Sequence, residues 1–357
     1  MMKKISLVLA ALMLFLFCGC SSTMVRTVVL PEEPDEGRIE PGELYAFEEL
    51  VPQNMVLNKF AGFDNDNRVV GWFTKGNNCC IMLFDVEARI GQQVVNTNEN
   101  VVSVKVAGEG KILYETVKNG VRSLYLVDKD GKTDKVAEYT AESSCVGADI
   151  DEDKRIFAAY RKDGKLKLLV ADTATGAQKT YDITSDIHVV AKDNLLSIIK
   201  IKDISVGKNG RIAVIVSAND HYYMWTGIMQ KNGTFKNSFV AECEGTEHVY
   251  VSTSVFYVAA DGSLMRFNAE KNEQSVIMSD VEEFVVSADE SVVACIRNQG
   301  TAKRVYVKET DPGPVTLVDI RQGIKSVVLN DDGTLLMLEC YGKADASGKY
   351  SVMELER

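Results

Sequence analysis

The 357-residue sequence lacks most of the short motifs that mark an enzyme or a metal site. It contains three histidines and eight cysteines, but no CxxC pair, no HExxH, no GxSxG, and no Walker or GxGxxG loop. These absences leave a zinc site, a thioredoxin-like site, a metalloprotease and a serine hydrolase without sequence support. A Ser-His-Asp arrangement stays open, because its members meet only in space.

Basic residues are also scarce. There are 40 Lys and Arg against 51 Asp and Glu, a formal net charge of -11. An acidic balance repels phosphate backbones, so we expect no nucleic-acid partner. Hydrophobic residues make up 46% of the chain, which excludes a disordered protein and permits a large core. We expect no metal and no other cofactor.

The N-terminus has the pattern of an export signal. A basic start at Lys3 and Lys4 precedes an apolar run, small residues and a cysteine, which is too short and one-sided for a membrane span. The stretch LFCGC (16–20) resembles a bacterial lipobox, with Gly19 at the small position before Cys20, although Phe17 departs from the usual leucine. The resemblance implies a signal peptide over 1–19 and lipid attachment at Cys20; an ordinary cleaved signal is the alternative. Multiple acyl chains, palmitate among them, would anchor the protein stably to the extracytoplasmic side of a bacterial membrane in the cell envelope.

Proline is rare except near the start of the chain. Four of the six prolines are Pro31, Pro34, Pro41 and Pro52. A segment rich in Pro and Glu cannot pack a core and tends to extend. We therefore expect residues 20–42 to be an acidic tether that holds residues 43–357 off the membrane.

Six cysteines follow Cys20, scattered singly except for one adjacent pair: Cys79, Cys80, Cys145, Cys243, Cys295 and Cys340. An exported protein could use them in disulfides. Their place in apolar runs such as VVACI favours buried small hydrophobes, while their redox state stays open. Adjacent Cys79 and Cys80 are expected to face opposite sides of a strand, with a vicinal bridge as the alternative.

Long helical patterns are absent, and short apolar runs alternate with Gly, Asn and Asp turns, as in an all-β protein. One unit recurs: an apolar residue, a polar turn and an apolar strand. Its copies are FDNDNRVVGWF (63–73), VAGEGKILYET (106–116), IDEDKRIFAAY (150–160), VGKNGRIAVIV (206–216), VSTSVFYVAA (251–260), VSADESVVACI (286–296) and LNDDGTLLMLE (329–339). A third strand follows each copy, and a fourth follows most. Four strands at a period near 40 to 45 residues describe one blade of a β-propeller.

Seven copies predict a single propeller of seven four-stranded blades, with six or eight as alternatives. The chain stops at Arg357, directly after the third strand of the last blade. We expect ELYAFEEL (43–50) to supply the missing outer strand and so close the ring.

The repeat resembles the turn-plus-strand unit of TolB-type and WD-repeat-like propellers, most clearly in VSADESVVACI and LNDDGTLLMLE. The turn proline of that unit is missing from every copy, as are the Trp-Asp and Gly-His pairs of true WD repeats. The resemblance covers roughly residues 43–357 and implies an architecture and a scaffold role in the envelope, without identifying a ligand.

The acidic turns at 64–67 and 330–332 allow two interpretations. Carboxylate and amide oxygens suit calcium. Sister copies read AGEG and GKNG, however, so a turn preference of Asp, Asn and Gly explains the pattern better than a metal.

Function is expected where the chain departs from the repeat. The departures are the insertion 185–200, which contains His188, the segment NDHYYMW (219–225), and the loop 341–349. The ligand-binding candidates are His188, His221, Tyr222, Tyr223 and Trp225. Aromatic side chains beside a polar loop suit a glycan or a peptide. The alternative is that Tyr223 and Trp225 alternate with Tyr222 and Met224 across a strand and pack between blades.

These patterns favour a membrane-anchored, non-enzymatic binding or scaffold module for a protein, peptide or glycan, held at one face of the propeller. An extracytoplasmic glycan hydrolase or lyase is one alternative, and a structural subunit of an envelope assembly machine is another. An enzyme predicts carboxylates or histidines with shifted pKa values at the channel mouth.

Overall fold

The computed structural model describes short N-terminal segments and most of the remaining chain. The described residues are 26–29, 37–38, 44–46 and 51–355, with gaps at 53, 147–153, 192–199, 208, 219–220, 269–270, 272, 300–301, 311–314, 322–323 and 341–349. The signal peptide, Cys20 and the loop 341–349 therefore lie outside the described residues. No helix in the described part of the chain is long and apolar enough to cross a membrane.

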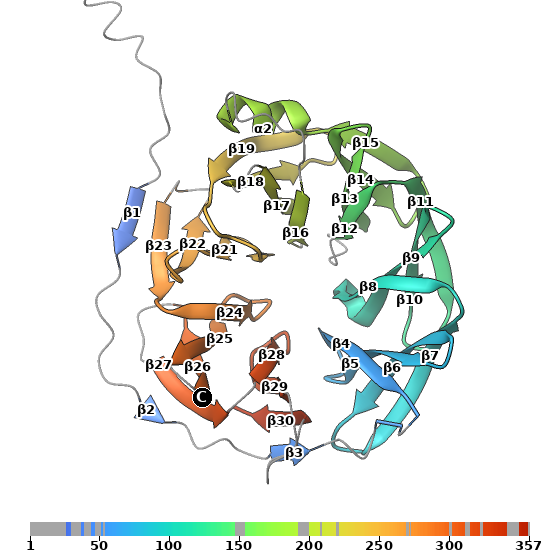
Figure 1. The fold of residues 1–357 in the computed structure, drawn as a ribbon, viewed down its shortest axis with the longest axis vertical. Helices are drawn as coiled ribbons and strands as arrows, with labels where there is room; N and C mark the ends of the chain where they lie inside the picture. Colours follow the sequence, from blue (N-terminus) through green and yellow to red (C-terminus); the bar gives the residue numbers. More distant parts are fainter. Residues whose placement is uncertain are drawn as a thin grey trace, which may run out of the picture.

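Seven sheets stand around a central axis, each with four antiparallel strands of one blade (Figure 1). This confirms the predicted seven-bladed propeller. The first three blades follow one another along the chain. Blade 1 contains β4 (Val56–Phe63), β5 (Val69–Lys75), β6 (Asn78–Asp85) and β7 (Ile90–Thr97). Blade 2 contains β8 (Asn100–Ala107), β9 (Lys111–Lys118), β10 (Val121–Val127) and β11 (Thr133–Thr140), with the 3-10 turn η2 (Gly108–Gly110) after β8. Blade 3 contains β12 (Ser143–Val146), β13 (Arg155–Lys162), β14 (Lys165–Asp172) and β15 (Gln178–Asp182).

The α-helix α2 (Thr184–Ala191) separates the first three blades from the last four. Blade 4 contains β16 (Lys200–Val206), β17 (Arg211–Ala218), β18 (His221–Met229) and β19 (Phe235–Glu242). Blade 5 contains β20 (Val249–Val251), β21 (Val255–Val258), β22 (Leu264–Asn268) and β23 (Glu273–Met278). Blade 6 contains β24 (Val281–Val286), β25 (Val292–Gln299), β26 (Ala302–Glu309) and β27 (Val315–Arg321). Blade 7 contains β28 (Ile324–Leu329), β29 (Leu335–Cys340) and β30 (Tyr350–Glu354).

The fourth strand of blade 7 comes from the other end of the chain. β3 (Leu44–Ala46) pairs antiparallel with β30, with Tyr45 opposite Val352. The predicted closure of the ring by the segment 43–50 is thus confirmed. Both ends of the propeller chain meet in one sheet, so no blade is left with an incomplete edge.

Two further N-terminal stretches lie on the rim of the propeller. β1 (Arg26–Val29) pairs parallel with β23 of blade 5, and β2 (Gly37–Arg38) pairs parallel with β27 of blade 6. Along the chain, β1, β2 and β3 pair with strands of blades 5, 6 and 7 in turn (Figure 1). An outer strand has backbone groups without a partner in its own blade, and such short stretches can satisfy them. The rest of the expected tether, 20–42, lies outside the described residues.

The recurring turn is built by side-chain oxygens that accept backbone hydrogen bonds. In blade 7, Asn330 Oδ1 accepts from the N–H of Leu335, and Asp332 Oδ1 accepts from the N–H of Thr334. In blade 1, Asp64 Oδ1 accepts from the N–H of Arg68 at 2.8 Å, and its Oδ2 pairs with the Arg68 guanidinium. The acidic oxygens of both turns therefore hold the turn itself.

The core lies between the blades. Each of seven clusters of buried side chains in the described residues joins two neighbouring blades, including blades 7 and 1. Because both faces of a blade are covered, central strands such as β17, RIAVIVSA, are buried at every position. Cys80, Cys243, Cys295 and Cys340 are buried in this packing.

Candidate functional site

The two faces of the propeller differ in their connections. One face has the connections between the second and third strands of each blade and the connections between consecutive blades. We call it the loop face, and we call the opposite face the turn face. All three departures from the repeat belong to the loop face by this topology, although residues 192–199, 219–220 and 341–349 themselves lie outside the described residues.

The aromatic candidates of β18 are divided between its two sides. Tyr223 and Trp225 are 2% and 1% exposed and pack between blades 3 and 4, while Met224 and half-buried Tyr222 face blade 5. Tyr223 and Trp225 therefore lie in the inter-blade core, where a ligand on the surface does not reach them. This agrees with the alternative prediction that they pack between blades. Tyr222 lies beneath Lys202, whose Nζ is 5.4 Å from the ring centroid.

The insertion after blade 3 begins as a helix that is fixed to blade 4. Trp225 Nε1 donates a 2.9 Å hydrogen bond to Asp186 Oδ2, and Ile187 is fully buried among blades 3 and 4. His188 lies in α2, but its side chain is outside the described part of the structure. The sequence did not predict this helix, because eight residues show little periodicity.

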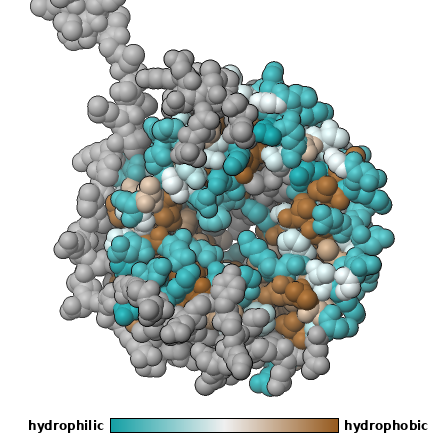
Figure 2. Space-filling model, in the orientation of Figure 1, coloured by the Kyte–Doolittle hydropathy of each residue, from teal (hydrophilic) through white to brown (hydrophobic). Residues whose placement is uncertain are grey.

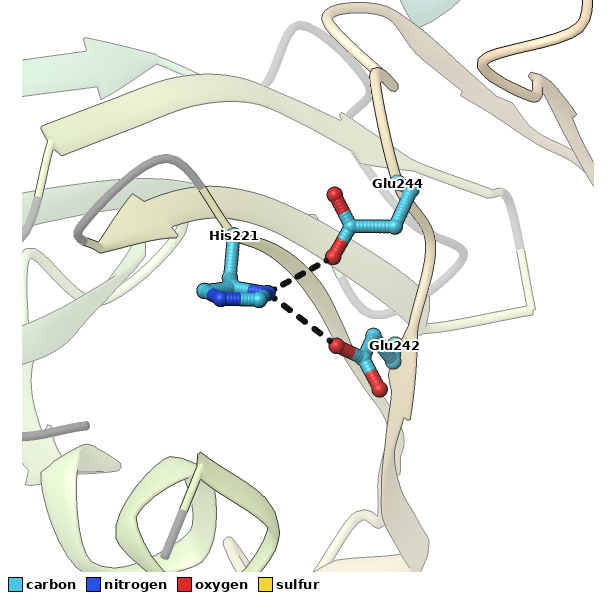
Figure 3. A group of neighbouring side chains, drawn as sticks. All are labelled: His221, Glu242 and Glu244. Atoms are coloured by element: carbon cyan, nitrogen blue, oxygen red, sulfur yellow. Dashed lines mark hydrogen bonds and ion pairs between the residues drawn. The ribbon is translucent and has the colours of Figure 1, made fainter. Parts of the chain in front are cut away.

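His221 lies on the loop face between two carboxylates (Figure 3). Its Nδ1 is 2.9 Å from Glu244 Oε1 and 3.4 Å from Glu242 Oε1. The hydrogen bond with Glu244, followed by the charge of that carboxylate and the contact with Glu242, raises the pKa of His221 above its ordinary value. We call these three residues the rim cluster.

A second group of charges lies along the central channel. It consists of Lys59, Lys105, Asp203, His248 and Glu283, which come from the inner strands of five blades or directly before them. We call this group the channel cluster. Asp203, His248 and Glu283 each stand three positions before the apolar residue that opens a repeat copy, so the repeat places them at one level of the channel.

Asp203 ties three inner strands together. Its Oδ2 accepts the N–H of Val249 at 3.1 Å, and its Oδ1 lies 3.7 Å from Lys105 Nζ. Burial acts to raise the pKa of Asp203, but Lys105, His248 and the N–H of Val249 outweigh it and hold that pKa below its ordinary value. His248 Nδ1 lies 3.7 Å from Asp203 Oδ2, and this contact raises the pKa of His248. The His248 side chain is 69% exposed, so the water of the channel reaches it.

Glu283 has the opposite environment. Burial raises its pKa above the ordinary value, and the charges of His248, Lys59 and Lys303 offset this only in part. A carboxyl with a raised pKa beside a histidine is a feature of functional sites as well as of structural ion pairs.

The two ends of the channel differ from each other. Toward the turn face it encloses a cavity of about 280 Å³, lined mainly by inner strands and by turns such as those at Gly207, Ser252 and Asp331. These turns touch from blade to blade: Ser252 Oγ donates to Ala288 O, and Ala288 N donates to Asp331 O. These contacts join the turns of blades 5, 6 and 7 at the turn-face end, whereas His248 lies toward the loop face. Figure 2 shows hydrophilic residues around much of the central opening.

Exposed apolar side chains do not gather on a surface of the described residues. The large ones are Val56, Ile90 and Val102, which come from three different strands, the inner and outer strands of blade 1 and the inner strand of blade 2. Single exposed apolar residues are normal on a protein surface. They do not indicate a broad hydrophobic docking patch.

Comparisons with known proteins support the fold. No protein-family model matches this chain, and neither does any curated protein sequence. An oligogalacturonate lyase in complex with manganese is similar at a TM-score of 0.60 and 13% identity, over 91% of this chain and 99% of the lyase. The β-propeller domain of the Trilobed protease from Pyrococcus furiosus has a TM-score of 0.58 and 10% identity, over 86% and 95%. The β-propeller domain of Cps50 (Swd1) from Myceliophteria thermophila has a TM-score of 0.56 and 11% identity, over 85% and 100%.

These likenesses place the chain in one architectural class, the β-propellers. Identities of 10% to 13% show the fold alone, and the similar structures include enzymes and parts of enzymes as well as a domain with no stated activity. The predicted resemblance to TolB-type and WD-repeat-like proteins is confirmed at the level of the propeller.

Proposed function

We propose that this chain is a lipid-anchored, non-enzymatic binding module that takes a peptide, or a peptide segment of a protein, at the channel mouth on its loop face. The observation that carries the proposal is the channel cluster, in which charges of both signs from five blades meet. Lys59 and Lys105 can receive carboxylates, and Glu283 can receive an ammonium or an amide N–H. A peptide offers both kinds of group.

The position of the aromatic side chains favours a peptide over a glycan. Glycan sites use exposed aromatic rings, but Tyr223 and Trp225 are buried and Tyr222 is covered by Lys202. The exposure of His248 toward the loop face favours an approach from that face.

Affinity capture tests this proposal with matched variants. The native lipidated protein is used as bait beside Glu283→Gln and His248→Ala, with Lys129→Ala as a control on the turn face, and captured proteins are identified by mass spectrometry. We expect a reproducible partner that both channel variants lose and Lys129→Ala keeps. A partner captured equally by all four proteins, or no reproducible partner, would overturn the proposal.

The raised pKa of Glu283 supports a second candidate function, that of an extracytoplasmic glycan hydrolase or lyase. Burial raises the pKa of Glu283, and a carboxyl with a raised pKa is suited to act as a general acid. Incubation with polysaccharides such as polygalacturonate, assayed for new reducing ends and unsaturated products, distinguishes this candidate. Activity that Glu283→Gln abolishes would support the enzyme. Inactivity of the wild type on every substrate would favour the binding module.

Anchoring at Cys20 is part of the proposal. Arg26, six positions after Cys20, already pairs with Glu273 in the outer strand of blade 5. Six extended residues span about 20 Å at most. A lipid on Cys20 would therefore hold the rim of blade 5 near the membrane, with the propeller edge toward it.

We expect Cys20→Ser to move the protein from the membrane fraction to the soluble fraction, because the attachment atom is lost. Cys18→Ser is the matched control and should stay with the membrane, since Phe17 does not fit the small position before a lipidated cysteine. Fractionation with detergent-free washing and immunoblotting measures both. Membrane retention of Cys20→Ser would contradict the assignment.

A further inference from the structure

The rim cluster is brought together by strand register. Tyr223 of β18 is opposite Glu242 of β19, and Cys243 N donates to Tyr222 O, which places Glu244 opposite His221. Side chains two positions apart share one side of a sheet. His221, Glu242 and Glu244 therefore project from the same side of the blade 4 hairpin, above buried Tyr223.

The spacing of the donor atoms fits a metal ion. A cation bound at about 2.1 Å by each donor sets neighbouring donors about 3.0 Å apart in an octahedral site and about 3.4 Å apart in a tetrahedral one. The distances from His221 Nδ1 to Glu244 Oε1 and to Glu242 Oε1 are 2.9 Å and 3.4 Å. All three donor atoms lie within 4.8 Å of one another, and Figure 3 shows Nδ1 turned toward both carboxylates.

The charge of the cluster is not balanced by a basic side chain. Among the described residues, Glu242 and Glu244 form ion pairs with His221 and with no lysine or arginine. With a neutral imidazole the cluster carries two negative charges, which a divalent cation would neutralise. In the connection that follows this hairpin, by contrast, Glu247 pairs with Lys202 of β16 at 2.7 Å.

We propose that His221, Glu242 and Glu244 form a binding site for a divalent first-row transition metal, such as Zn²⁺ or Mn²⁺, at the rim of the loop face. One imidazole and two carboxylates suit such a metal, whereas Ca²⁺ and Mg²⁺ prefer oxygen donors alone. Three protein ligands leave positions for water or for an acidic group of a bound molecule. The site is separate from the channel cluster and does not depend on peptide binding there.

Calorimetric titration of the full chain in detergent and a non-chelating buffer tests the site with the metals alone. We expect one equivalent of Zn²⁺ or Mn²⁺ to bind, and the melting temperature to rise with metal concentration. His221→Ala and Glu244→Gln should each weaken metal binding at least about tenfold. Loss of a residue that hydrogen-bonds to a metal ligand already lowers affinity by about that factor, and loss of the ligand itself should lower it no less. The side chains of His221 and Glu244 are 43% and 47% exposed, so the variants should keep the metal-free melting temperature.

His248→Ala is the matched control, because His248 is also exposed but, among the described residues, forms an ion pair with Asp203 alone. It should keep the wild-type affinity. The absence of Zn²⁺ and Mn²⁺ binding would overturn the proposal. Equal weakening by His248→Ala would do the same, since it would indicate unspecific binding to surface histidines. Equal affinity for Ca²⁺ or Mg²⁺ would also overturn it, by showing that His221 is not a ligand.

Discussion

A chain that begins at residue 51 should melt roughly 5 to 10 °C below one that begins at residue 43, because the first lacks β3. β3 is short, but it is the strand that joins the start of the propeller to its last blade. Tyr45 is opposite Val352, and Leu44 and Ala46 pair on either side of it. Loss of these backbone bonds, together with exposure of the β30 edge, costs on the order of 3 to 5 kcal/mol.

The edge that β3 covers belongs to a buried strand. Val352 and Met353 are each 2% exposed and contribute to the packing of blade 7 against blades 1 and 6. Without β3, the backbone groups of β30 are free to pair with another chain. We therefore expect the shorter chain to aggregate as well as to unfold at a lower temperature.

Calorimetry and light scattering measure the two consequences. The chain that begins at residue 43 is the proper control, because it also lacks β1 and β2, which pair only with the outer strands of blades 5 and 6. Removal of those two strands should have a small effect. Equal melting temperatures for the two chains would contradict the role of β3 in closing the ring.

The sequence predicts the fold because the repeat combines two independent signals. Asn, Asp and Gly at the turn and apolar residues on both sides of it recur along the chain. A copy with a weak pattern is therefore recognised by comparison with the other copies. Even the short copy at 251–260 forms a regular blade, with β20 and β21 joined by a turn of three residues. In LNDDGTLLMLE the two aspartates belong to a turn, as comparison with the sister copies indicated.

The outer strand of blade 1 carries neither signal. This strand is β7, IGQQVVNT, and its first four side chains are all exposed. A strand on the rim has one neighbour and little to bury, so its residues need not alternate or be apolar. Its place is set by pairing with β6, which a local pattern does not reveal.

The candidate sites were harder to predict for a different reason. His221 was identified, but its partners Glu242 and Glu244 are near it only through the antiparallel register of β18 and β19. The channel cluster does have a sequence signal, since Asp203, His248 and Glu283 occupy one repeat position. It becomes visible only when each copy is extended backward into its first strand. The aromatic run does not reveal that Tyr223 and Trp225 are buried, because burial depends on the neighbouring blade, which is distant in sequence.

Trp225→Ala should be among the most destabilising single substitutions, with a loss of about 4 kcal/mol. Trp225 is 1% exposed and packs edge-on against Phe235, with ring centroids 5.1 Å apart. Its indole also holds α2 through Asp186. Alanine would leave a cavity between blades 3 and 4 and would deprive Asp186 of its donor.

Trp225→Phe separates these two effects. It keeps most of the apolar packing but removes the Nε1–H donor, so it should cost about 1 to 3 kcal/mol, the range for breaking a hydrogen bond to a charged group. Hydrogen exchange should then rise in Thr184–Ala191 while the strands of blade 4 stay protected, because α2 alone loses its polar contact. Thermal melting and exchange mass spectrometry measure both variants. Unchanged exchange in α2 for Trp225→Phe would show that burial of Ile187 is enough to hold the helix, and that the hydrogen bond contributes little to fixing the insertion on the loop face.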